Sequence, residues 1–558
     1  MVRVFATLSF LVAIASATPS FRSIDPLVTI RNGTIRGLHS NVWNQDFFLG
    51  VPYCQPATGS NRFALPKPIT TKWKGELVAQ TFGDRCLGLH HPFPDLPQSE
   101  DCLNINIIRP TGYSNTKLPI LVWIHGGGFT SSGSSNPPYN MTWMVDQSVK
   151  IGKPIMGVSF NYRLTAWGML SSTSMSAAGI SNIGLHDQRT ALHWVQENIE
   201  AFGGDPRKVT IGGDSAGGVS VGIHTQAYFG RDDKLFRAAI HDSGPGLFIG
   251  AYATMPTLDK LYNALLANVS CTMAADKLSC LRQVPSNVMW AAIQTVDSQY
   301  PTQWQYHVDG GIIPELSSVA LQKGHFVKVP ILVGSTTDEG TYAIGYGVNT
   351  TDELIAFLKV AAAVPIDQDT IDTILELYPD NPVIGIPGGT IERFPPPYGL
   401  QYKRLAAIAG DYYLIAGRRF TSRVWAQRGL TAYSWRFDTI PNGVPREMGS
   451  THVTDQAFVF ANFQGVGYGE NYYDVSPLSR KENYIRVGLL MSRSLVSFVH
   501  DLTPNNHGVP GYPKWPKYDL HRPQNFVFLG NTTSFVEDDD FRVPQIDLWI
   551  DNSQEYGH

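Results

Sequence analysis

Charge of either sign is scarce in this sequence. Only 16% of its 558 residues are charged, against 43% that are apolar, and the formal net charge is −4. Such a chain has enough apolar side chains for a large core, and it lacks the basic excess that binds nucleic acid. Internal repeats and low-complexity blocks are missing too. We therefore expect a globular protein with no nucleic-acid partner.

Long hydrophobic runs are also missing. A membrane-spanning helix needs about 20 consecutive apolar residues, and the sequence has no run of that length. The N-terminal stretch MVRVFATLSFLVAIASA places one arginine before a shorter apolar segment, which ends in Ala15-Ser16-Ala17. This arrangement is typical of a secretory signal peptide. We predict a signal peptide over residues 1–17, a secreted chain 18–558 and no transmembrane anchor.

Cysteine is rare, with five residues in the whole chain. Cys86 and Cys102 lie close in sequence, as do Cys271 and Cys280, whereas Cys54 has no near neighbour. In a secreted chain this spacing favours two local disulfides and one free thiol. Spacing alone leaves the connectivity open, because five cysteines can form two bridges in fifteen ways.

Five N-x-S/T triplets are candidate N-glycan sites in a secreted chain. They begin at Asn32, Asn140, Asn268, Asn349 and Asn531. Such triplets are short enough to arise by chance. We expect most of them, and not all, to carry a glycan.

The chain alternates apolar strand-like runs with helical segments. LPILVWIHG, PIMGVSFNYR and KVTIGGD are predicted strands, and DQRTALHWVQENIEAFG has the spacing of an amphipathic helix. Three later runs, FRAAIHDSG, VPILVGSTTDEG and GLTAYSWRFD, predict further strands, with helical segments such as TDELIAFLKVAAAV between them. Alternation of this kind predicts a mostly parallel sheet covered by helices. We expect a single α/β domain with long helical insertions.

One serine stands between glycines where a predicted strand meets a predicted helix. Ser215 lies in the run GGDSAGG, which contains the pattern G-x-S-x-G. In this turn the serine backbone is strained, and its hydroxyl projects at the carboxyl edge of the sheet. Upstream, the run IHGGGF follows an apolar strand, so Gly127 and Gly128 are candidate oxyanion-hole donors together with the N–H of Ala216. The two motifs together indicate a nucleophilic serine rather than a flexible turn.

A serine nucleophile needs a histidine base that is held by a carboxylate. In α/β-hydrolases the chain order is serine, then acid, then histidine. Asp338 and Glu339 follow the predicted strand VPILVGS, where the acid is expected. We take His452 as the base, because it lies in a polar loop between a predicted strand and an apolar run. The other later histidines lie at a helix end or in the tail: His500, His507, His521 and His558.

Several motifs together resemble the type-B carboxylesterase/lipase family, which includes fungal lipases of the Candida rugosa type and the cholinesterases. The motifs are SEDCLNINI, HGGGF, FNYRL, NIGLHDQRTALHWVQENIEAFGGDP, GGDSAGG and DEGTY, and they appear in the family's order. The run SCTMAADKLSCLRQ is similar to the fungal lipase branch. The resemblance covers nearly the whole mature chain and implies an α/β-hydrolase fold that needs no metal or organic cofactor.

The resemblance also implies a role for individual residues. It implies a catalytic triad of Ser215, Glu339 and His452, with Gly127, Gly128 and Ala216 as oxyanion donors. It implies the disulfides Cys86–Cys102 and Cys271–Cys280, with Cys54 unpaired. Asp214 stands where the family usually has a glutamate. We expect it to support the histidine and its surroundings together with Ser243 and Asp455.

The sequence departs from the fungal lipases at its first disulfide loop. Only fifteen residues, 87–101, separate Cys86 from Cys102, and they include the run HHPFPDLP, whose prolines are unsuited to a helix. In the lipases that the chain resembles, this loop is a longer helical lid. We therefore expect an open-site serine carboxylesterase that acts on small, soluble, short- to medium-chain esters through an acyl-enzyme. The alternatives are a lipase acting on emulsified glycerides and, less favoured because the triad is complete, a non-catalytic binding protein of the same fold.

Overall fold

Short runs of valine, isoleucine and leucine form the strands at the centre of the molecule, as the sequence predicts. The computed structural model describes residues 25–114, 116–247, 252–301, 304–361, 366–389 and 391–555. The predicted signal peptide 1–17 lies outside these residues, and the single-domain organisation of the mature chain stays a prediction. In the described part of the chain, no helix has both the length and the apolar content needed to cross a bilayer.

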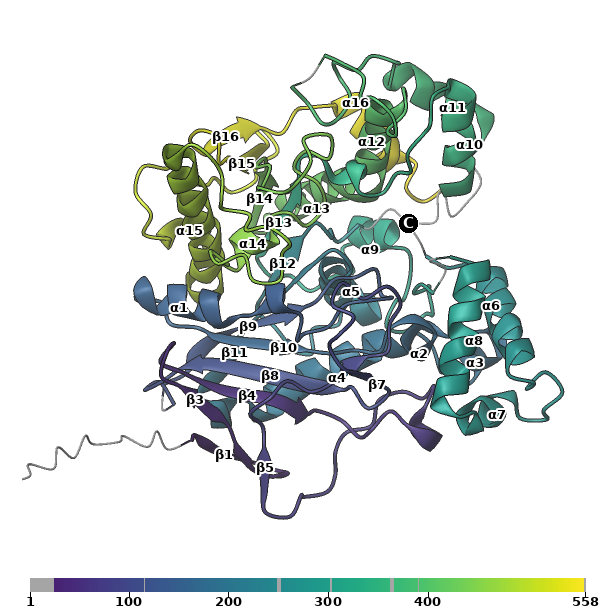
Figure 1. Ribbon diagram of the computed structural model, residues 1–558, viewed down its shortest axis with the longest axis vertical. Helices are drawn as coiled ribbons and strands as arrows, with labels where there is room; N and C mark the ends of the chain where they lie inside the picture. The colour runs from purple at the N-terminus through teal and green to yellow at the C-terminus, as the bar shows by residue number, and fades with distance from the viewer. Residues whose placement is uncertain are drawn as a thin grey trace, which may run out of the picture.

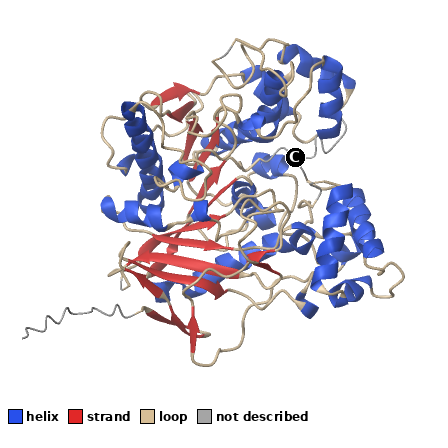
Figure 2. Ribbon diagram, in the orientation of Figure 1, coloured by secondary structure: helices blue, strands red, loops and turns tan. Residues whose placement is uncertain are grey.

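Eleven strands form one sheet that runs through the molecule (Figures 1 and 2). In order across the sheet they are β16 (Phe535–Asp538), β15 (Gln524–Phe528), β14 (Ala432–Phe437), β13 (Ile331–Thr336), β12 (Ala238–Asp242), β11 (Gly204–Asp214), β9 (Leu118–Ile124), β10 (Met156–Phe160), β8 (Asn104–Pro110), β4 (Gln45–Pro52) and β3 (Leu38–Ser40). The strands from β15 to β10 pair in parallel, whereas β16 at one edge and β8, β4 and β3 at the other pair antiparallel. The predicted, mostly parallel α/β-hydrolase sheet is confirmed. The sequence analysis did not predict its antiparallel edge strands.

Short strands outside this sheet form two smaller sheets. They are β1 (Leu27–Ile30), β2 (Gly33–Arg36) and β5 (Glu76–Val78) in one, and β6 (Arg85–Cys86) and β7 (Gln98–Ser99) in the other. The second of these sheets joins the start of the first disulfide loop to a segment near its end.

Helices cover both faces of the large sheet because both faces are apolar. Along β9, Ile120, Val122 and Ile124 belong to one buried cluster, while Leu121 and Trp123 belong to another. The first cluster is covered by α4 (Ile183–Asn198), α5 (Ala216–Gly230) and α13 (Ala416–Gln427). The second is covered by α1 (Thr142–Lys150) and α15 (Leu478–Asp501).

The predicted long helical insertions are present between the later strands. Between β12 and β13 the chain forms α6 (Met255–Asn268), α7 (Lys277–Gln283), α8 (Ser286–Gln299) and α9 (Ser317–Lys323). Between β13 and β14 it forms α10 (Thr351–Ala361), α11 (Gln368–Leu377), α12 (Tyr402–Gly410), a π-helical turn (Asp411–Ile415) and α13. Figure 1 shows α6 to α8 as one group and α10 to α12 as another. The remaining helices are α2 (Thr165–Met169), α3 (Thr173–Ala177), α14 (Gln456–Val459) and α16 (Val543–Asp551).

The cysteines pair as the family resemblance implies. Cys86 is bonded to Cys102 and Cys271 to Cys280, and Cys54 is a buried free thiol. The first disulfide closes the loop that the sequence analysis singled out as too short for a lid.

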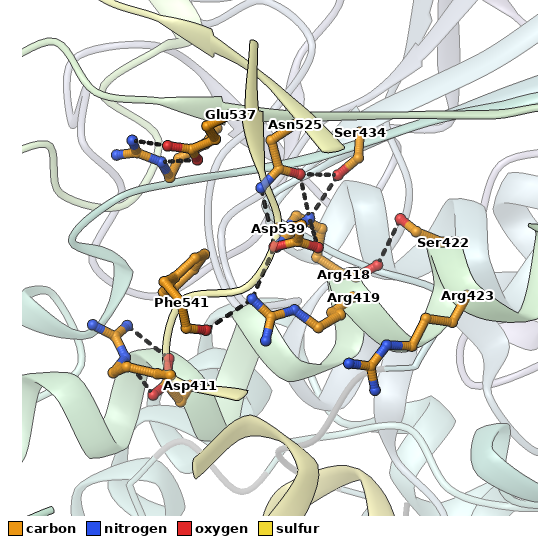
Figure 3. Close-up of polar contacts among 12 residues, drawn as sticks. Asp411, Arg418, Arg419, Ser422, Arg423, Ser434, Asn525, Glu537, Asp539 and Phe541 are labelled. Atoms are coloured by element: carbon orange, nitrogen blue, oxygen red, sulfur yellow. Dashed lines mark hydrogen bonds and ion pairs between the residues drawn. The ribbon is translucent and has the colours of Figure 1, made fainter. Parts of the chain in front are cut away.

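A buried ionic network fastens the C-terminal segment to α13 (Figure 3). The carboxylate of Asp539, which follows β16, accepts hydrogen bonds from Arg418 (2.7 and 3.2 Å), Arg419 (2.8 Å), Asn525 (3.0 Å) and Tyr518 (2.8 Å). Burial opposes the ionisation of Asp539, but the two guanidinium groups prevail and hold its pKa far below the usual range. Asp539 therefore stays ionised and paired near neutral pH.

The five glycan triplets differ in their exposure. Asn268, Asn349 and Asn531 are exposed and Asn140 is half-buried. Asn32 is only 7% exposed, and its amide donates to two backbone carbonyls at 3.0 Å each. A glycan on Asn32 would replace one of the two amide hydrogens and so break one of these hydrogen bonds, which makes Asn32 the least favoured of the five sites. All five stay predicted glycan sites.

Candidate active site

Ser215 occupies a sharp turn between β11 and α5. Its φ of 52° and ψ of −124° lie outside the regions that non-glycine residues usually adopt. A Cβ atom on Gly213 would lie 2.5 Å from the backbone of Gly217, and one on Gly217 would lie 2.0 Å from the carbonyl oxygen of Ile124. Both glycines are therefore required by close backbone contacts, and the turn leaves Ser215 partly exposed.

A continuous line of hydrogen bonds joins Ser215, His452 and Glu339. The Nε2 atom of His452 lies 2.8 Å from Ser215 Oγ, and its Nδ1 atom lies 2.6 Å from Glu339 Oε2. Glu339 begins the 3-10 turn Glu339–Thr341 directly after β13, and His452 lies in the loop after β14. Because an ionised carboxylate can only accept, Nδ1 carries a proton and Nε2 is left to accept the hydroxyl proton of Ser215.

The electrostatic surroundings make His452 a stronger base than an ordinary histidine. Burial alone would lower the pKa of His452, because the residue is only 8% exposed. The charge and hydrogen bond of Glu339 outweigh this effect, so the pKa of His452 is raised above 6.5. The imidazolium that forms during proton transfer is stabilised in the same way.

Glu339 is itself held in place by two donors. Its Oε1 atom accepts a hydrogen bond of 2.6 Å from Ser243 Oγ and one of 2.8 Å from the backbone N–H of Thr336. Its side chain is almost completely buried. The structure therefore places Ser243, a predicted supporting residue, on the carboxylate rather than on the histidine.

The glycine-rich loop after β9 packs directly against the serine turn. A Cβ atom on Gly126 would lie 3.0 Å from Ser215 Cβ. Gly127 and Gly128 follow with φ values of 104° and 62°, which glycine adopts without strain. Ala216 is the first residue of α5, so its N–H has no acceptor within that helix. The three predicted oxyanion donors thus come from two segments that meet at Ser215.

Asp214 is bonded to aromatic side chains. Trp123 Nε1 donates to its Oδ1 at 3.0 Å, and the hydroxyl of Tyr139 donates to its Oδ2 at 2.8 Å. Burial raises the pKa of Asp214 to about 6 despite these two bonds. Asp214 thus anchors the strand end beneath Ser215, and Tyr139 and Trp123 are partners that the sequence analysis did not identify.

A fourth carboxyl group, which the sequence analysis missed, lies beside Asp455. Asp242 ends β12, is 1% exposed and makes side-chain contact with the fully buried Asp455. It is also in register with Asp214 on the neighbouring strand β11. A sequence signal was available, since both β11 and β12 end in an Asp-Ser pair, at Ser215 and at Ser243.

Tyr342 is another residue that sequence reasoning missed. Its ring centroid lies 4.9 Å from that of His452, and the side chain is 67% exposed. Although the residue is part of the run DEGTY, nothing in the pattern distinguishes it from a buried tyrosine. Its position makes it part of the site's rim.

The first disulfide loop contains no helix and is fastened beside the glycine-rich loop. The N–H of Leu89 donates to Thr130 O at 2.7 Å, and the N–H of Ser132 donates to His91 Nδ1 at 2.9 Å. The buried Arg85 donates to two carbonyls of the loop at 2.7 and 2.8 Å. The first two bonds hold the loop to the segment that carries Gly127 and Gly128, and those of Arg85 fix the loop's own backbone.

Comparisons with known proteins agree with this geometry. The chain matches the carboxylesterase family over residues 24–549. It is 31% identical to Lipase 4 of Diutina rugosa over 98% of each chain, and 31% identical to Secreted lipase 1 of Botryotinia fuckeliana over 96% of this chain and 93% of that one. The crystal structure of Aspergillus niger EstA superposes with a TM-score of 0.82 at 26% identity, covering 96% of this chain and 99% of that one. The carboxylesterase EST55 of Geobacillus stearothermophilus superposes with a TM-score of 0.75 at 28% identity, covering 94% and 99%. Match length, sheet order and the turn that carries Ser215 lead to one conclusion: this chain belongs to the carboxylesterase family.

Proposed function

We propose that this protein is a secreted serine carboxylesterase that hydrolyses small, soluble esters of short to medium chain length. The family makes it an ester hydrolase. The observation that supports the serine mechanism is the line of hydrogen bonds from Ser215 through His452 to Glu339, with distances of 2.8 and 2.6 Å. Secretion is supported by the N-terminal signal pattern and by relatives that are named as secreted lipases.

The proposed reaction has two halves that use the same groups. Nε2 of His452 takes the proton of Ser215 as Oγ attacks the ester carbonyl carbon, and the oxyanion turns toward the N–H groups of Gly127, Gly128 and Ala216. The imidazolium then gives its proton to the departing alcohol oxygen, which leaves the acyl group on Oγ. Water, deprotonated by the same Nε2, attacks the acyl-enzyme, and Ser215 leaves with the proton as the acid is released.

The preference for dissolved esters rests on the first disulfide loop. The loop is short, non-helical and bonded at Leu89 and His91 to the segment of the oxyanion loop. A short segment fixed at these two residues cannot close over the active site and open again as a lid does. Hydrolysis should therefore need no lipid surface to uncover Ser215.

A lipase acting on emulsified glycerides is the second candidate function. Relatives in the comparison are named lipases, and large apolar side chains are exposed at Tyr342, beside His452, and in the segment between α11 and α12. The residues of that segment are Val383, Ile384, Ile391 and Leu400. Such a surface can rest on lipid. A non-catalytic binding role is less favoured, because all three triad side chains are present and hydrogen-bonded.

A series of p-nitrophenyl esters of rising acyl length tests the proposal, with each substrate taken from fully dissolved to emulsified. We expect saturation on dissolved short esters and no jump in rate at the solubility limit. Ser215→Ala should abolish turnover, with residual activity at least about 10³-fold below the unmodified enzyme. The matched control Ser298→Ala removes an exposed hydroxyl from α8 and should retain full activity.

Two outcomes would overturn parts of the proposal. Unchanged turnover in Ser215→Ala would refute the serine mechanism. A steep rise in rate at the solubility limit, with long chains preferred, would establish the lipase instead.

A further inference from the structure

Four carboxyl groups cluster beneath the active site, and three of them, those of Glu339, Asp214 and Asp455, act on a single imidazole. All four carboxyl groups are buried to 2% exposure or less, and His452 is the imidazole. The carboxyl groups belong to Asp214 at the end of β11, Asp242 at the end of β12, Glu339 after β13 and Asp455 before α14. Negative charge on these groups favours the protonated form of His452, which cannot accept a proton from Ser215.

The four carboxyl groups differ in their hydrogen-bond donors. Glu339 receives donors from Ser243 and from a backbone N–H, and Asp214 receives two from aromatic side chains. In the described part of the chain, no donor forms a hydrogen bond with any of the four carboxyl oxygens of Asp242 and Asp455. Their side chains lie within hydrogen-bonding reach of each other. Both are enclosed, since Asp242 is 1% and Asp455 0% exposed.

Two such carboxyl groups in contact cannot both be ionised. Burial penalises each charge, and the charge on one opposes the charge on the other. The hydrogen bond that can join them needs a proton on one of the two oxygens, as O–H···O⁻. In agreement, burial and the neighbouring charges raise the pKa of Asp242 well above its usual range and that of Asp455 to about 7.

We propose that Asp242 and Asp455 share one proton, and that this proton limits the negative charge facing His452. Asp242 and Asp455 are then positioning residues, which act on the reaction through the histidine. This effect on catalysis rests on the proposed function, in which His452 is the base. The ionisable groups that face the pair or its neighbours are Asp214, Glu339, His452, Tyr139 and Tyr468.

Asparagine substitutions test how many negative charges the pair of Asp242 and Asp455 carries. Above pH 7 the pair carries one negative charge if it shares one proton. In Asp242→Asn or Asp455→Asn the remaining carboxylate is ionised and accepts from the new amide, so the charge is still one. The double variant Asp242→Asn/Asp455→Asn is neutral.

The pH dependence of kcat/KM reports this charge through its effect on the pKa of His452. The midpoint of the acid limb should stay within about 0.2 pH unit of the original enzyme in each single variant. In the double variant it should move to lower pH by about 0.5 unit or more, because a negative charge that favoured the imidazolium is gone. A pair with both groups ionised would instead shift the midpoint downward at the first substitution, which would overturn the proposal.

Infrared spectra give a second readout that does not depend on turnover. They are recorded at pH 8 in the Ser215→Ala background. The carbonyl stretch of one protonated carboxyl group should be present with the pair intact and lost in either single asparagine variant. Circular dichroism verifies that each variant is folded. Absence of this band with the pair intact would overturn the shared proton even if the enzyme proved to have another activity.

Discussion

His452 is almost fully enclosed, yet its neighbours hold it basic rather than acidic. Because only the neutral imidazole can accept the proton of Ser215, activity falls as pH drops through the pKa of His452. That pKa is raised above 6.5, so the acid limb of kcat/KM should have its midpoint above pH 6.5. His452 also faces Asp214 and Asp455, whose negative charges likewise raise its pKa.

Glu339→Gln should expose the contribution of the carboxylate. Without its charge, burial dominates, and the acid limb should move to lower pH while kcat falls about 10²- to 10⁴-fold. Glu376→Gln changes an exposed residue on α11 and serves as the control. A limb that stays in place in Glu339→Gln would contradict the electrostatic role of Glu339.

At the residue scale, the sequence predicts the three triad positions because each follows a recognisable strand in a fixed order. Asp242 escaped prediction because its importance lies in a contact with Asp455, which is 213 positions further along the chain. Tyr342 escaped for a similar reason, since only the packed structure shows it against His452. Contacts between loops that are distant in sequence carry no local pattern.

The serine turn is the element on which the oxyanion site depends. A Cβ atom at Gly217 would lie 2.0 Å from the Ile124 carbonyl oxygen, which immediately precedes the glycine-rich loop. Gly217→Ala should therefore separate the turn from that loop and reduce kcat by at least about 10²-fold, as loss of an oxyanion donor does.

The control is Gly469→Ala, where the added methyl group meets nothing within 4 Å. Initial rates, compared at equal folded fraction by circular dichroism, provide the measurement. Equal activity of the two variants would show that the backbone can yield at Gly217 without cost.

Helices and strands were predictable where the apolar residues recur with a clear period. They were uncertain where tertiary packing determines the local structure. The apolar runs at β9 to β14 and the amphipathic α4 match the sequence. The long helical stretch that begins near Tyr402 is interrupted by the π-helical turn Asp411–Ile415, where Asp411 pairs with Arg542 at 2.8 Å. Nothing in the local sequence reveals that tertiary pair, and the short antiparallel edge strands were equally hidden.

At the scale of the whole molecule, the carboxylate of Asp539 is a buried ionic link between the C-terminal segment and α13. Asp539→Asn would leave Arg418 and Arg419 buried without their counter-charge, which should lower the free energy of unfolding by about 3–5 kcal/mol. The midpoint of urea unfolding, followed by tryptophan fluorescence, measures the effect. Asp538→Asn changes the exposed neighbour on β16 and should leave the midpoint nearly unchanged. Equal midpoints for the two variants would contradict a stabilising role for the network in Figure 3.

The spacing of the active-site residues along the chain has a consequence for the protein during its synthesis. Glu339 and His452 are 113 residues apart, and Ser215 and His452 are 237 residues apart. A ribosome makes Ser215 and its turn long before it makes the histidine that activates the serine. A nascent chain therefore has no working nucleophile until the loop after β14 has been synthesised and has docked against β11 and β13. The onset of ester hydrolysis can therefore report that folding is complete. Truncated or stalled chains should not hydrolyse the esters of the cell that produces them.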